Sequence, residues 1–346
     1  MKCYKFILVI LVIFFQTKTL LSNQNIFNVN NIELIKKTNI SNDESANMAI
    51  KKGFKELIKK ILLDNDIKKM DQLSFDKIRE LVLYYQVSSS IDEKKKEKLL
   101  YNIYFDKEKL HKLFYDKNIF YSEALNKELY VLPVLKKNKQ LFIYNNNYFY
   151  ENWNKVYKNE IVEFILPIEN IEIIQNINFN KNNLLNLDLR NIFQEYTEKD
   201  LALILIDIQE KNCKIYLKTS IQGNKIDKNI LLKKLDFSNQ EFYENIISQT
   251  SNEIVNIIKS QNLIDIRTPS FLNTKLLVNN KNNLAELSKR LKKIDSIDDI
   301  FIQEFNKDFI LIKIKYLGKL DKIIRKLEQN EIILELKNDE WSLKII

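Results

Sequence analysis

The sequence predicts an α/β protein built from several packed units, the last of them ferredoxin-like. Short apolar runs of strand length alternate with stretches whose apolar residues recur every three or four positions. The segment from Arg267 to Ile346 shows this alternation in the order βαββαβ, followed by one more hairpin strand. The 346 residues exceed the usual size of one domain, and 45% of them are hydrophobic, as in globular proteins.

Residues 1–22 have the pattern of a secretory signal peptide. Lys2 and Lys5 precede an unbroken apolar run, Phe6–Phe15, and Ser22 offers a small residue for cleavage soon after it. This run is shorter than the roughly 20 apolar residues that cross a bilayer. We expect export and cleavage after Ser22, with an uncleaved membrane anchor as the alternative. Cleavage would remove three lysines and no acid, so the formal net charge would fall from +9 to +6.

Residues 23–125 are expected to form an N-terminal α/β unit. Ile26–Ile35 has the pattern of a strand, and Ser41 and Glu44 have the spacing of a helix capping box. The helix that follows carries Gly53 within its apolar stripe, where the missing side chain would let a neighbouring element approach closely. The remaining elements are a β-hairpin around a lysine-rich turn and a short amphipathic helix, expected at Leu81–Ile91, Lys98–Phe105 and Asp106–Asp116.

Residues 126–266 are expected to form a central sheet domain with helices on both faces. Its strands are near-continuous apolar runs, which is typical of strands buried on both sides. Pro133 and Pro167 favour sheet edges or strand exits, because proline cannot donate to a ladder. The strands are expected at Leu129–Leu135, Ile161–Ile168, Leu201–Ile208 and Lys211–Ser220, and a long amphipathic helix at Asn239–Ser260.

Residues 267–346 carry the pattern of the ferredoxin-like unit. Apolar stripes that begin at Leu284 and Leu320 predict two helices, and the turn Asn306–Asp308 joins two of the strands. The expected strands are Lys275–Val278, Ile300–Phe305, Phe309–Tyr316, Ile332–Leu336 and Trp341–Ile345.

The scarce residue types exclude several kinds of site. Dinucleotide and P-loop sites need clustered glycines, whereas the three glycines here lie more than 90 residues apart. One histidine, His111, and one cysteine beyond the leader, Cys213, cannot supply the ligands of a zinc site. We therefore expect no metal, no organic cofactor and no catalytic residue. His111 is expected to be a solvated or capping helix residue. Cys213 is expected to be a buried thiol in a strand, with an intermolecular disulfide as the alternative.

The Tyr144–Tyr157 segment is the candidate binding site. It concentrates aromatic residues among asparagines, and aromatic rings with polar tips suit half-exposed recognition surfaces. The candidate partner-binding residues are Tyr148, Tyr150 and Trp153, and the alternative is that Trp153 fills the core of the sheet. Basic residues are interspersed along the chain, so no nucleic-acid partner is expected.

Several short features of the sequence follow one another in a characteristic order. They are the early strand, the helix Ala46–Leu62, Tyr104–Asp106, Val131–Leu135 with Trp153 downstream, Phe164–Ile171, and Tyr316–Gly318 leading to Trp341–Leu343. This order resembles the proteobacterial family known as domain of unknown function 2066, which often has an Asn-Pro-Trp turn where the present chain has Glu151-Asn152-Trp153. The resemblance implies an exported envelope protein, and it indicates no activity and no site residue. The central segment is also similar to the α/β folds of outer-membrane assembly proteins of the curli-secretion and Tol types.

Together these observations predict a non-enzymatic periplasmic protein of the cell envelope. We expect it to act in assembly or scaffolding through contacts with an envelope protein, and not to span the membrane once processed. One alternative is a module that binds an envelope glycan. Another is a degenerate hydrolase, whose two carboxylates could not be singled out among 46 acidic residues.

Overall fold

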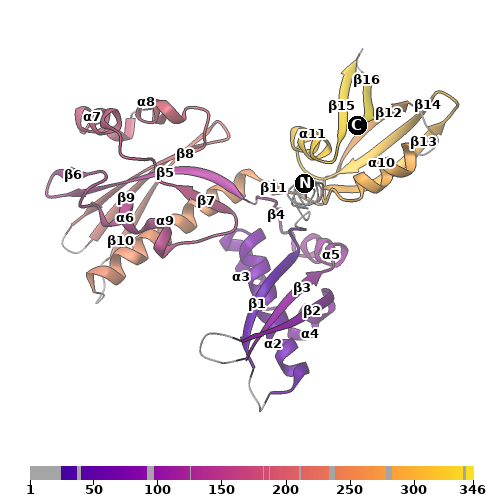
Figure 1. Ribbon diagram of the computed structural model, residues 1–346, viewed down its shortest axis with the longest axis horizontal. Helices are drawn as coiled ribbons and strands as arrows, with labels where there is room; N and C mark the ends of the chain where they lie inside the picture. Colours follow the sequence, from indigo (N-terminus) through magenta and orange to yellow (C-terminus); the bar gives the residue numbers. More distant parts are fainter. Residues whose placement is uncertain are drawn as a thin grey trace, which may run out of the picture. The chain divides into compact units, whose positions relative to one another are not determined.

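The computed structural model describes residues 25–36, 40–91, 97–124, 126–181, 183–186, 188–209, 212–233, 238–277, 283–337 and 340–346. The predicted signal peptide, the lysine-rich turn 92–96 and Val278 lie outside these residues. Helices and strands alternate along the described chain, and the strands form sheets packed against helices (Figure 1). The α/β fold expected from the sequence is confirmed.

The chain divides into two compact units. The first combines described residues from 1–58, 69–120 and 264–346, and the second combines residues 59–68 with 121–263. Each of the three expected segments carries a sheet of its own. The N-terminal and C-terminal segments nevertheless belong to one unit, in which Lys107 Nζ donates to the backbone oxygen of Asp295 at 2.6 Å.

The N-terminal segment forms a three-stranded antiparallel sheet in the order β1-β3-β2. The expected hairpin is confirmed, and Asp106 caps the helix that follows it by accepting from the backbone of Glu108 at 3.0 Å. Two further helices, α3 and α4, were not predicted because six or seven residues are too few to show an apolar stripe. The elements are β1 (Asn28–Ile35), α2 (Asn42–Ile61), α3 (Asp64–Met70), α4 (Phe75–Glu80), β2 (Val82–Ile91), β3 (Glu97–Phe105) and α5 (Lys107–Lys117).

Gly53 allows a close approach between α2 and β3, as the sequence predicted. A Cβ atom on Gly53 would lie only 2.6 Å from Cδ1 of Ile103, a fully buried residue of β3. Glycine costs a helix about 1 kcal/mol relative to alanine. This cost is offset because the helix packs directly on the strand.

We expect Gly53→Ala to destabilise the protein, although alanine is the better helix former. The added methyl group should overpack the core by about 1–3 kcal/mol, more than the gain in helix propensity. In an Ile103→Val background, which lacks Cδ1, the same substitution should instead stabilise. Urea denaturation of the four proteins measures this coupling. A gain of about 1 kcal/mol from Gly53→Ala in the otherwise unaltered chain would contradict the close packing.

The second unit contains a six-stranded mixed sheet, β10-β9-β8-β5-β6, with β7 also paired to β5. Two short strands, β4 (Tyr121–Ser122) and β11 (Leu263–Ile264), pair where the chain enters and leaves this unit. Strands β10 and β6 were not predicted, because the apolar residues Ile230–Leu232 of β10 follow a polar stretch and β6 has only three residues. The strands are β5 (Lys127–Lys137), β6 (Gln140–Phe142), β7 (Val162–Ile165), β8 (Leu201–Ile208), β9 (Asn212–Ile221) and β10 (Asn224–Lys233).

Helices cover both faces of this sheet, as the near-continuous apolar strands indicated. Figure 1 shows α6 (Tyr148–Val156) and α9 (Asn239–Gln261) on one side, and α7 (Ile171–Phe179) and α8 (Leu189–Ile192) on the other. Alternate residues of β8 face the two helical layers. Ile204 belongs to the core cluster of Trp153 and Phe242 on one face. Leu203 belongs to the cluster of Ile173 and Phe193 on the other face. The sheet is therefore the middle layer of an α/β/α sandwich.

Pro133 lies inside the central strand β5, so the expected edge position was wrong. Its partner in β8 is Ile204. On the opposite side of β5, β7 pairs only with Lys127–Tyr130 and β6 only with Leu135–Lys137, which leaves a gap between them. The backbone N–H of Lys127 points to the β7 side, and alternation along the strand places Pro133 on the same side. Pro133 therefore lies in the stretch of β5 where neither β7 nor β6 pairs with the strand. Its missing N–H leaves no hydrogen bond of the ladder unmade there.

The side chain of Asn147 fills this gap. It is fully buried, and its Nδ2 donates to the carbonyl oxygens of Pro133, Phe142 and Ile143 at 2.8, 3.0 and 2.8 Å. Its Oδ1 accepts from the backbone N–H of Phe149 at 3.2 Å and thereby caps α6. One carboxamide thus joins the middle of β5, the end of β6 and the start of α6.

The C-terminal segment forms a five-stranded sheet in the order β13-β14-β12-β16-β15. The predicted order of elements, βαββαβ plus a hairpin strand, is confirmed. The final strand β16 does not extend the sheet at its edge but lies between β15 and β12, parallel to β12. The elements are β12 (Ser270–Leu277), α10 (Asn283–Leu291), β13 (Ile297–Phe305), β14 (Phe309–Tyr316), α11 (Leu320–Gln329), β15 (Ile332–Lys337) and β16 (Glu340–Ile345).

Candidate functional site

The aromatic segment Tyr144–Tyr157 folds largely as helix α6, and the helix buries part of it. Phe149 and Trp153, one turn apart, both face the core, and Trp153 is 0% exposed. The ring of Phe164 from β7 meets the indole edge-on, with 6.1 Å between ring centroids. The exposure expected for Trp153 is therefore wrong, because the i, i+4 spacing puts it on the same helix face as Phe149.

Tyr148 and Tyr150 are half-exposed, as expected, but they do not share a surface. The ring of Tyr148 lies 5.2 Å from that of Tyr243 on α9. Tyr150 instead meets Tyr144 at 5.0 Å, and its hydroxyl donates to the backbone oxygen of Pro167 at 2.8 Å. Residues two positions apart in a helix point about 200° apart. The rings of Tyr148 and Tyr150 therefore pack in opposite layers of the sandwich.

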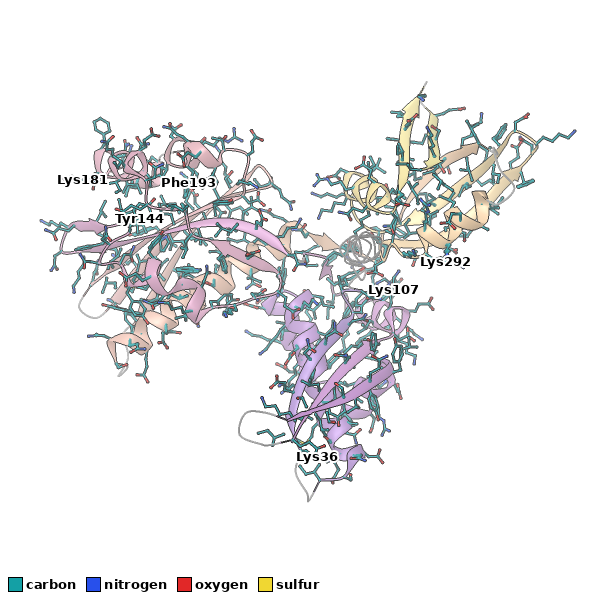
Figure 2. All side chains as sticks on the ribbon, viewed as in Figure 1. Lys36, Lys107, Tyr144, Lys181, Phe193 and Lys292 are labelled. Atoms are coloured by element: carbon teal, nitrogen blue, oxygen red, sulfur yellow. The ribbon has the colours of Figure 1, made fainter. Side chains whose placement is uncertain are left out.

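Tyr150 belongs to a cluster of four tyrosines on the α7 and α8 side of the central sheet. Tyr130 of β5 and Tyr196 have ring centroids 4.6 Å apart, and the Tyr196 hydroxyl interacts electrostatically with both Tyr144 and Tyr150. Figure 2 shows Tyr144 and Phe193 between the sheet and these helices. Burial raises the pKa of Tyr144, Tyr150 and Tyr196 above the ordinary value, so these phenols stay neutral and can donate hydrogen bonds.

Two strongly exposed isoleucines flank this cluster. Ile168 follows the Pro167 carbonyl that Tyr150 binds and is 79% exposed, while Ile171 begins α7 and is 71% exposed. Between them, Glu169 accepts from the side chain of Asn145 at 3.3 Å. We call the half-exposed Tyr130, Tyr150 and Tyr196 together with Ile168 and Ile171 the tyrosine surface, and Tyr144 lies buried beneath it. The tyrosine surface combines apolar area with polar tips, the composition of a recognition surface.

Sequence reasoning found Tyr150 but missed the two isoleucines. The run Ile161–Ile168 was expected to be one strand, whereas β7 ends at Ile165. Pro167 cannot donate to a ladder and disfavours strand continuation, so the chain leaves the sheet before Ile168. The Pro167 exit was itself expected, and this signal could have shown that the apolar residues beyond it are not core.

Cys213 and Lys259, two side chains with reactive groups, are both buried in the second unit. Cys213 of β9 is fully buried, as expected, and burial raises its thiol pKa to about 12. The ammonium of Lys259 is buried and donates to the backbone oxygens of Leu62, at 2.8 Å, and Lys59. Burial lowers the pKa of Lys259 to about 8 against the opposing charge of Asp64. Within the described ranges, no group of three or more His, Cys, Asp or Glu residues is placed to hold a metal ion.

His111 on α5 is half-buried rather than solvated, which differs from the expectation. Its ring meets Phe27 edge-on, with centroids 5.6 Å apart. Burial lowers its pKa to about 4, assisted by the charge of Lys107 and opposed by that of Asp298. His111 is therefore neutral at physiological pH and acts as part of the packing of the N-terminal sheet.

The lowered pKa of His111 predicts that stability falls with acid. Between pH 6.5 and about 4 the unfolded chain binds a proton at this site that the folded chain does not, so the free energy of unfolding decreases as the pH drops. We expect a contribution on the order of 2 kcal/mol after allowance for partial exposure. His111→Gln removes this proton, so the difference in unfolding free energy between the two proteins should change between pH 7 and pH 4.5. A difference independent of pH would contradict the assignment.

Comparison with known proteins gives a likeness among solved structures and none among family models or curated proteins. No family model matches the chain, and no curated protein is similar to it at a significant level. Among solved structures, the chain is similar to an uncharacterized protein at 10% identity with a TM-score of 0.19, over 40% of this chain and 93% of the other. The resemblance to the family of unknown function 2066 stays a prediction. Among the described residues, no helix combines the length and apolar character that crossing a membrane requires.

Proposed function

We propose that this chain is a non-enzymatic protein of the cell envelope that acts in assembly or scaffolding and binds a partner protein on the tyrosine surface. The observation that supports this most directly is the exposure of Ile168 and Ile171 beside half-exposed tyrosines. Contiguous exposed apolar patches often mark interaction sites, and tyrosine is enriched among the residues that dominate binding energy. The signal-peptide pattern of residues 1–22 supports the compartment.

A protein partner suits this surface better than a glycan. A sugar would use the flat faces of Tyr130 and Tyr196 and the polar groups of Asn145 and Glu169, but it would gain little from two exposed isoleucines. A protein can bury isoleucine side chains in a pocket, which stabilises binding by about 1.5–3 kcal/mol for a fully buried side chain. The glycan remains the second candidate because Glu169, which binds Asn145, and Tyr196, which meets Tyr130, both act electrostatically on Tyr150.

The proposal predicts site-specific cross-linking in the native host. A photoreactive benzoyl-phenylalanine in place of Ile171 should form an adduct of defined mass with another envelope protein. The matched control is the same replacement at Leu231, an exposed residue of β10 at the opposite edge of the central sheet. Tyr150→Ala, introduced together with the probe at Ile171, should reduce the adduct several-fold, because the hydroxyl of Tyr150 holds the Pro167 carbonyl next to Ile168.

Equal adducts at both positions, or none at Ile171, would contradict the proposal. Binding to isolated envelope polysaccharide would favour the glycan alternative if Tyr130→Ala abolished it while Ile168→Ser left it unchanged. Tyr148→Ala serves as a further control, because Tyr148 lies in the other layer of the sandwich and should not change the adduct.

A further inference from the structure

Among the described residues, strand β2 (Val82–Ile91) pairs with β3 on one side only and is therefore an open edge of the three-stranded sheet. Its sequence, VLYYQVSSSI, contains no charged residue and no proline. An unpaired strand presents a row of free backbone donors and acceptors, and soluble proteins commonly protect such edges with charge, proline, bulges or short length. From Tyr84 onward β2 pairs with β3 residue by residue and has none of these protections.

The other long edge strands in the described chain are protected. Strand β1 is interrupted by a bulge between Val29 and Ile32, where Asn31 has a φ of 59°. Strand β13 has two register shifts against β14. The short edge strands are β6 and β7, with three and four residues, and β4 and β11, with two residues each. Charged residues also lie on the long edges: Glu33 on β1, Lys225, Asp227, Lys228 and Lys233 on β10, Asp298, Asp299 and Glu304 on β13, and Glu335 and Lys337 on β15.

Both faces of β2 expose apolar side chains. Tyr85 and Val87 lie on the same face as their cross-strand partners Ile103 and Tyr101. The partners are buried, whereas Tyr85 and Val87 remain 42% and 49% exposed. On the other face, Tyr84 stacks on Tyr104 with 4.3 Å between centroids and is itself exposed. A further strand beside β2 would cover these side chains and satisfy the free backbone groups.

We propose that β2 pairs with β2 of a second copy of this chain, antiparallel about a twofold axis. Two three-stranded sheets then join into one continuous sheet of six strands. The occupant is a second copy because the strand carries no charged residue and can therefore pair with itself without like-charge repulsion in any register. An antiparallel pair of identical strands is also self-complementary, as a twofold interface requires.

The side chains favour a register with Gln86 at the twofold axis. In this register Tyr85 of each copy lies opposite Val87 of the other copy. The interface then contains two cross-strand pairs of an aromatic and a β-branched residue, and such pairs stabilise antiparallel strands. The same register puts Tyr84 opposite Ser88 on the second face. This interface lies in the first compact unit, whereas the tyrosine surface lies in the second, so each proposal can fail without the other.

The mass of the whole chain in solution, measured by light scattering after gel filtration, tests the proposal. The unaltered protein should have the mass of two chains, and Val87→Lys should reduce the measured mass to that of one chain. The control is Leu231→Lys on the charged edge β10, which should keep the mass of two chains. A single-chain mass for the unaltered protein, or two chains in Val87→Lys, would overturn the proposal.

Disulfide formation gives a second measurement that does not depend on weakening the interface. With Gln86→Cys, mild oxidation should link two copies of the chain through residue 86, because the twofold axis brings the two thiols together. The test uses the chain without residues 1–22, in which Cys213 is the one native cysteine and is fully buried. The control Leu231→Cys, on a different edge strand, should give no linked dimer. Linkage of residue 86 to a different protein, or no linkage, would contradict pairing with a second copy.

Discussion

The second unit depends on one buried carboxamide. Strand β5 pairs with β8 along most of its length, but its other side is shared by β7 and β6 with a gap between them. Pro133 removes a backbone donor from this gap, and the two N–H groups of the Asn147 carboxamide, one of them shared, donate to three carbonyl oxygens. Buried carbonyl groups without a donor are costly. The position of α6, and with it that of Tyr150 and Trp153, follows from this connection.

Much of the fold could be predicted because burial leaves a periodic pattern. The two-sided sheet was evident from runs such as Leu201–Ile208, and the C-terminal order of elements from its alternating strands and helical stripes. Strand order is different, because it depends on pairing partners and not on local pattern. The position of β16 between β15 and β12 and the central place of Pro133 are set by neighbours that are distant in the chain. Local strand propensity does not reveal these positions, because they depend on contacts between distant parts of the chain.

The candidate site was only partly predictable for a related reason. The density of aromatic residues around Tyr150 is visible in the sequence, but the division of the segment between core and surface depends on its being a helix. Trp153 and Phe149 turn inward at i, i+4 spacing, and Tyr148 and Tyr150 turn to opposite layers. The open edge β2 was predicted as a strand of a hairpin, yet an edge is defined by the absence of a neighbour, which the sequence does not encode locally. Which side chains are exposed is therefore decided by the order of the strands in each sheet.

The most direct test of the role of Asn147 is the free energy of unfolding of Asn147→Asp compared with Asn170→Asp. Both asparagines cap a helix through Oδ1, and asparagine and aspartate cap about equally well. Asn147 also donates to three carbonyl oxygens, through two buried hydrogen bonds and one partly buried one, and a carboxylate would instead repel these oxygens. Asn147→Asp is predicted to cost on the order of 3–5 kcal/mol at pH 7, as an uncompensated buried charge does, while Asn170→Asp should stay within about 0.5 kcal/mol. Equal, small effects of the two substitutions would contradict the account.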